Sequence, residues 1–172
     1  MSYAREYDWV PISNSIPEYH FGKSGKVNMW IEFEKSNGQL WRGSFECGFK
    51  GERKIIEFDD YFFVFADGIG YKINNDSNSL EFRTENEYIF AHKVNEKEIV
   101  VVNWKGLFIL NERNEIVLIK NLLDLDLFEL IGENSISIIG KFESSEFQWE
   151  RRYYRLNKET KKIEISKSEY EL

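Results

Sequence analysis

The chain is poor in cysteine, histidine and proline, and each shortage excludes a class of protein. Its 172 residues include a single cysteine, Cys47, so no disulfide can form within the chain. The cysteine frameworks typical of small secreted domains are therefore excluded. Two histidines and one cysteine, far apart in the chain, also fall short of the ligand set of a structural zinc site. The two prolines, Pro11 and Pro17, leave the rest of the chain uninterrupted.

Long apolar runs and excess positive charge are missing as well. No stretch approaches the roughly 18 uncharged apolar residues of a membrane-spanning helix. Charged residues lie between Met1 and Asp8, where a secretory signal needs an apolar segment, so we expect a cytoplasmic protein with no membrane partner. The 30 acidic residues outnumber the 23 basic ones and give a net charge of −7. This sign disfavours nucleic acid as a partner and favours a basic one.

What the chain does contain is ample material for a core. Apolar residues make up 42% of the sequence and aromatic residues 16%. A chain of this length buries roughly 70% of the surface exposed in its unfolded state. We therefore expect one domain over residues 1–172, monomeric when free.

A short pattern recurs in the second half of the chain. An alternating aromatic and aliphatic run ends in asparagine and a polar turn at Gly70–Asn74, again at Gly106–Asn111, and again at Arg152–Asn157. Recurrence every few tens of residues is typical of repeating β architectures. The pattern predicts an all-β, antiparallel fold in which repeated four-stranded units form an open, propeller-like (half-propeller) array.

The predicted organisation has three parts. Residues 1–26 form an irregular or edge-packed lead-in, residues 27–58 form hairpins, and residues 60–166 form the propeller-like repeats. We expect the first repeat to start at the strand 61–66 and end with 88–92, the second to span 99–130 and the third 135–165. Within the second, 122–131 reads as a strand, although a helix competes.

Several short motifs have a chemical and a structural interpretation. Asn74, Asp76 and Asn78 are spaced like calcium ligands, but hairpin turns use the same residues. Asp67–Gly70 suggests a phosphate loop, but no third glycine follows, and a turn between two strands explains both glycines. Cys47 with a histidine would need hydrogen-bond contact for catalysis, and a cysteine between phenylalanines is usually buried. We expect no metal or cofactor.

Acidic residues are the better candidates for contacting a partner. Residues two apart on a strand share a face, so Asp124 and Asp126 are expected to form an acidic stripe, to which Glu129 is a further candidate. The same stripe could equally be a solvated outer face. The basic residues Arg151, Arg152 and Arg155 lie among aromatics, and either bind nucleic acid or pair with nearby glutamates. The residues expected to contact a partner are Asp59, Asp60, Asp67, Trp104, Asp124, Asp126 and Glu129.

A small, acidic, all-β chain rich in asparagine, lysine, glutamate and isoleucine, without a catalytic motif, resembles an immunity protein. Such proteins belong to bacterial contact-dependent growth inhibition and related polymorphic toxin systems. The resemblance lies in overall character, and no residue role is transferred by it. It implies a non-enzymatic toxin inhibitor that occludes the active site of a cognate basic toxin, often a nuclease. The alternative is a small β carbohydrate-binding module or glycoside-acting enzyme.

Overall fold

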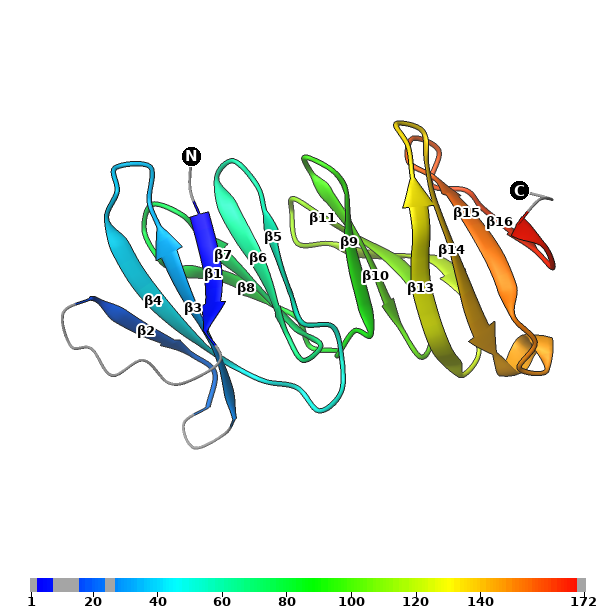
Figure 1. The fold of residues 1–172 in the computed structure, drawn as a ribbon, viewed down its shortest axis with the longest axis horizontal. Coiled ribbons are helices and arrows are strands. Elements are labelled where there is room, and N and C mark those ends of the chain that lie inside the picture. The colour runs from blue at the N-terminus through cyan, green and yellow to red at the C-terminus, as the bar shows by residue number, and fades with distance from the viewer. Residues whose placement is uncertain (1–2, 8–15, 24–26, 170–172) are drawn as a thin grey trace. The chain divides into compact units, whose positions relative to one another are not determined.

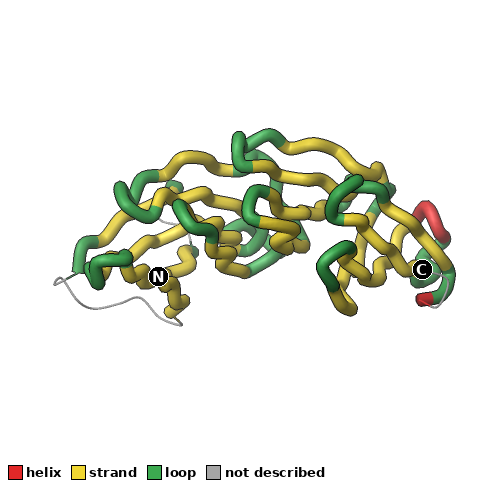
Figure 2. Tube along the Cα trace, turned by 90° about the horizontal axis from the view of Figure 1, so that it is seen from above, coloured by secondary structure: helices red, strands yellow, loops and turns green. Residues whose placement is uncertain are grey.

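The protein is built from four four-stranded β-sheets, and a computed structural model describes residues 3–7, 16–23 and 27–169. Two compact units divide the chain at Glu87 and Tyr88, and each unit contains two of the sheets (Figure 1). Strands dominate both units, and the short 3₁₀ turn near the C-terminus is the one helical element among the described residues (Figure 2). None of the described helical residues forms a segment long and apolar enough to cross a membrane. The prediction of an all-β fold made of four-stranded units is confirmed.

The first unit pairs a mixed sheet with an antiparallel one. In the mixed sheet, of order β1-β3-β4-β2, the edge strand β2 runs parallel to β4 and the other pairs are antiparallel. The second sheet has the order β5-β6-β7-β8. The strands of this unit are β1 (Tyr3–Tyr7), β2 (Glu18–Phe21), β3 (Asn28–Glu34), β4 (Leu40–Glu46), β5 (Lys54–Glu57), β6 (Tyr61–Ala66), β7 (Ile69–Asn74) and β8 (Leu80–Arg83).

Aromatic rings join the two sheets of the first unit. Phe33 on β3 lies with its ring centroid 5.0 Å from that of Phe62 on β6, and Phe45 on β4 lies 5.3 Å from Tyr71 on β7. All four side chains are buried in one apolar cluster. Alternate residues of each strand therefore face a shared core, as in neighbouring propeller blades.

The second unit consists of two antiparallel sheets, of order β12-β11-β10-β9 and β13-β14-β15-β16. Phe90 on β9 contacts Phe128 on β13 with ring centroids 5.0 Å apart, and both join a buried cluster with Phe142 and Tyr154. The elements are β9 (Phe90–Asn95), β10 (Glu98–Asn103), β11 (Gly106–Asn111), β12 (Ile116–Asn121), β13 (Leu125–Glu133), β14 (Ser137–Ser144), η1 (Ser145–Phe147), β15 (Arg152–Asn157) and β16 (Ile163–Ser166).

The recurring asparagine has a structural role. Asn74, Asn111 and Asn157 are the last residues of β7, β11 and β15, each the third strand of its sheet in chain order. In each case the side-chain Oδ1 accepts backbone N–H bonds from the following turn, at 2.8 to 3.0 Å. The repeat is therefore a strand followed by an asparagine-closed hairpin turn.

The predicted grouping of strands into repeats is wrong by one strand. Each sheet begins one strand earlier than expected, so β5 opens the second sheet and β9, which includes His92, opens the third rather than ending the repeat before it. Adjacent strands in a chain look alike, and only the pairing distinguishes a connection within a sheet from one between sheets. Strand β13 covers most of 122–131, so strand is correct there. In the lead-in, β1 and β2 pack at the sheet edges.

Candidate protein-binding surface

Three loops of the second unit are hydrogen-bonded to one another at one end of its sheets. The β10–β11 turn contacts the β12–β13 connection: the Leu122 N–H donates to the Lys105 carbonyl at 3.0 Å, and the Leu125 N–H to the Trp104 carbonyl at 3.3 Å. The β12–β13 connection in turn contacts the β14–β15 loop, because the single hydroxyl hydrogen of Ser145 is shared between Asp124 Oδ2 at 2.9 Å and the Leu123 carbonyl at 3.3 Å. One continuous network of backbone and side-chain hydrogen bonds therefore fixes all three loops.

Each of these loops exposes a large apolar side chain. Trp104 is 46% exposed, Leu123 59% and Trp149 52%. Single exposed apolar residues are ordinary, but two tryptophans and a leucine on bonded neighbouring loops are not. We call these three residues the aromatic loop surface.

Backbone strain accompanies this surface. Asp124, Gln148 and Trp149 have φ values of 47°, 55° and 61°, in the left-handed region that side chains other than glycine rarely adopt. Such a conformation costs on the order of 1 kcal/mol or more per residue. Two of these residues are consecutive and end with the exposed Trp149. The fold holds that side chain outward at a cost in stability, which is typical of functional loops.

Acidic and basic groups surround the aromatic loop surface. Asp124, Glu146 and Glu150 are exposed. Arg152 pairs with Glu150 at 2.9 Å, and its guanidinium lies 5.1 Å from the Phe147 ring centre. Arg151 pairs with Glu143 at 3.4 Å. The positive charges of Arg151 and Arg152 are thus both balanced by glutamates of the same protein. The pairing interpretation of those two arginines is the one the structure supports.

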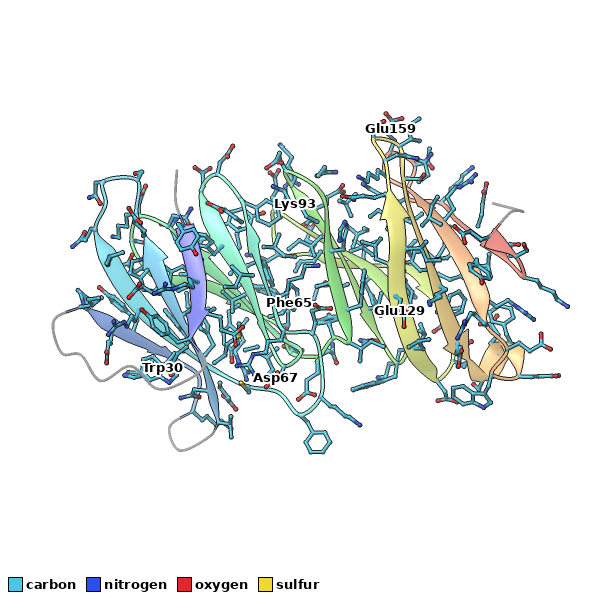
Figure 3. The ribbon with its side chains drawn as sticks, in the orientation of Figure 1. Trp30, Phe65, Asp67, Lys93, Glu129 and Glu159 are labelled. Carbon is cyan, nitrogen blue, oxygen red and sulfur yellow. The ribbon has the colours of Figure 1, made fainter. Side chains whose placement is uncertain are left out.

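The predicted residues are divided between the two units. Asp59 and Asp60 precede β6, whereas Asp67 (Figure 3) follows it and pairs with Arg53 at 3.7 Å. These acids therefore lie at opposite ends of one strand. Trp104 and Asp124, by contrast, lie on bonded loops of the aromatic loop surface.

The expected acidic stripe is not a regular row. Asp124 precedes β13 in a left-handed turn, and Glu129 lies within the strand, where its carboxylate pairs with Lys141 at 2.7 Å (Figure 3). Between Leu125 and Phe128 the pairing with β14 shifts register, which breaks the two-residue period on which the expectation rested. The side chain of Asp126 is outside the described part of the structure.

Two residues of the aromatic loop surface, Leu123 and Trp149, are not predicted as binding residues from the sequence. The sequence places Leu123 in a strand over 122–131 and Trp149 in the third repeat, over 135–165. Both lie in loops. In the sequence, Trp149 lies between the polar residues Gln148 and Glu150, and this local pattern could have indicated an exposed tryptophan.

The remaining motifs have structural roles. Asn74 Oδ1 is held by the Ser77 hydroxyl and two backbone N–H groups, which closes a hairpin turn. Cys47 is buried, and its thiol lies 4.0 Å from the Phe45 carbonyl. Burial, reinforced by the Asp67 carboxylate, raises the pKa of the Cys47 thiol to about 12. Such a thiol stays protonated and is a poor nucleophile. The described residues contain no cluster of acidic, histidine and cysteine side chains able to hold a metal ion.

Comparison with known proteins adds no relatives. No protein-family model matches the chain, and no curated protein matches its sequence.

Proposed function

We propose that this protein is a non-enzymatic inhibitor of the immunity-protein type. It would bind a cognate basic protein toxin, for example a nuclease, through the aromatic loop surface and occlude the toxin's active site. The observation that carries the proposal is the exposure of Trp104, Leu123 and Trp149 on loops fixed by mutual hydrogen bonds. Tryptophan anchors on a rigid frame are typical of the energetic centres of protein interfaces.

Charge supports a basic partner. The chain carries a net charge of −7, and Asp124, Glu146 and Glu150 lie exposed beside the apolar anchors. A negative field accelerates capture of a positively charged protein, and apolar anchors then slow its release. Fast capture and slow release both suit an inhibitor that must bind a toxin before the toxin can act.

The experiment is to mix the protein with the product of the gene adjacent to its own and measure a dissociation constant. We expect a stable one-to-one complex and protection of cells from growth arrest by that product. The double variant Trp104→Ala/Trp149→Ala should weaken binding by at least about 100-fold, since each hot-spot residue contributes roughly 2 kcal/mol or more.

Ile136→Ala is the matched control. Ile136 is 61% exposed and lies in the turn at the opposite end of β14 from Ser145, in the same unit. Its removal should leave affinity unchanged. Equal losses in the two variants, or no complex at all, would count against the proposal.

A sugar-binding module is the second candidate, because two exposed tryptophans on adjacent loops also suit the apolar faces of sugar rings. A glycan array distinguishes the two: binding that is lost in Trp104→Ala/Trp149→Ala would favour the module, and a blank array would remove it.

A further inference from the structure

A pocket of about 450 Å³ lies in the last sheet of the second unit, away from the aromatic loop surface. Its lining comes from the β13–β14 turn, from β14, β15 and β16, and from the β15–β16 turn, which Glu159 marks in Figure 3. These turns join the strand ends opposite to the β14–β15 loop that carries Trp149.

The pocket opens on the face of this sheet that points away from the core. Ile138 and Leu156 are fully buried in the core cluster. The next residues along their strands, Ile139 and Arg155, are paired in register and therefore project to the other face. Arg155 is in turn paired in register with Glu164 on β16.

Among the residues that the structure describes, the half-buried Arg155 has no ion-pair partner. Its Nε atom is buried and has no hydrogen-bond acceptor in that part of the chain. Within the described residues, Arg155 forms no ion pair with its cross-strand neighbour Glu164 either. Buried charged donors are normally satisfied, so this donor is available to an acceptor from outside the chain.

The other polar groups of the pocket are mainly donors. The Oδ1 atoms of Asn134 and Asn157 accept N–H bonds from Ser137 and Thr160 respectively, at 2.8 Å each, as part of their turns. Only the amide NH₂ group of each asparagine remains for a ligand. Lys162 adds a second positive charge to the lining. Against these donors the lining contains one carboxylate, that of Glu164.

We propose that this pocket binds a single oxyanionic group, a carboxylate or a phosphate, held by the guanidinium of Arg155. The planar guanidinium matches either group through two parallel hydrogen bonds, and Lys162 and the two asparagine amides complete the donor set. The two positive charges of this site, on Arg155 and Lys162, lie in a chain whose overall charge is negative, so the affinity for an anion would come from these particular residues. It is independent of the proposed toxin-binding function.

The test uses the full chain with inorganic phosphate and succinate as separate probes. Binding is followed by calorimetry and by chemical-shift changes at Arg155 and Asn157. At least one probe should bind. Phosphate alone identifies a phosphate site, and succinate alone a carboxylate site. Arg155→Gln should weaken binding at least about tenfold, because a charge-assisted bond is lost. Arg155→Lys should weaken it as well, since it keeps the charge and loses the planar fork.

Arg113→Gln is the control, because Arg113 is an exposed arginine of the same unit outside this pocket. Its affinity for the probe should equal that of the unaltered protein. If Arg155→Gln does not fold, Arg155→Lys and Lys162→Gln take its place. Absence of binding by both probes, or binding that is unaffected by the changes at positions 155 and 162, would overturn the proposal.

Discussion

The Ser145 hydroxyl donates a hydrogen bond to Asp124 Oδ2 at 2.9 Å, across two loops that are separated by the whole hairpin of β13 and β14. This bond joins the start of β13 to the turn that follows β14. Asp124 adopts a left-handed conformation at this point, and the exposed Leu123 precedes it. The geometry of the aromatic loop surface therefore depends on a contact between polar residues of the same loops.

Ser145→Ala should weaken partner binding while leaving the fold intact. The change removes one hydrogen bond near the surface, which corresponds to about 0.5–1.5 kcal/mol of unfolding free energy. The loss of fixed loop geometry should reduce affinity several-fold. Ser77→Ala, which removes a comparable hydroxyl bond in the β7–β8 turn, is the control. Urea unfolding and calorimetry on both variants would check this, and an equal effect of the two on affinity would contradict it.

Gln148→Gly should stabilise the protein. Gln148 has a φ of 55°, where glycine has no steric penalty, so the substitution relieves strain despite the greater freedom of glycine in the unfolded chain. We expect a gain of about 0.5–1 kcal/mol in the free energy of unfolding. Glu146→Gly, two residues earlier in η1, should instead destabilise by up to about 1 kcal/mol. Thermal unfolding of the pair decides the matter, and a loss of stability in both would show that the loop stores no strain.

Gly140→Ala should be strongly destabilising, whereas Gly132→Ala in the neighbouring strand should be nearly neutral. A Cβ at Gly140 would lie 2.1 Å from the Glu129 carbonyl oxygen and 2.4 Å from the Tyr154 ring. At Gly132 nothing lies within 4 Å of the added atom. Overpacking of this kind costs about 1–3 kcal/mol, and backbone displacement between β13 and β14 increases it. Denaturant midpoints that are the same for the two variants would rule out the tight pairing of these strands.

Cys47 should make the protein less stable as the pH rises above 9. Burial raises the pKa of its thiol from 9.0 to about 12, so between these values the unfolded chain releases a proton that the folded chain retains. Ionisation therefore favours the unfolded state in this range. Tyrosines and lysines titrate there too, so the comparison is between the protein and Cys47→Ala. The stability of the variant should fall less between pH 8 and pH 10.5. Parallel curves would mean that the thiol is accessible.

The sequence predicted the strand content better than the surface. Strand periodicity and the asparagine-closed turns are local signals, so β7, β11 and β15 could be found from the chain alone. Pairing is not local. The shift of one strand in the predicted repeats, and the bulges that separate Asp124 from Glu129, arise from contacts between distant segments.

Loop geometry was the hardest part to predict. Trp104 was recognised as a candidate, but Trp149 and Leu123 join it only because hydrogen bonds gather three loops from across the second unit. Alternation of leucine with aspartate at 122–126 favoured a strand there. The left-handed conformation of Asp124 ends that alternation. Aspartate tolerates this conformation, but two aspartates alternate with leucine there, and nothing local shows which of them adopts it.

Hydrogen–deuterium exchange on the complex with the adjacent gene product tests the central claim most directly. If the aromatic loop surface is the interface, complex formation should slow exchange at 104–105, 122–125 and 145–151. The turn around Ile136 should exchange at its original rate. Protection confined to other parts of the chain, with these three loops unchanged, would contradict the account.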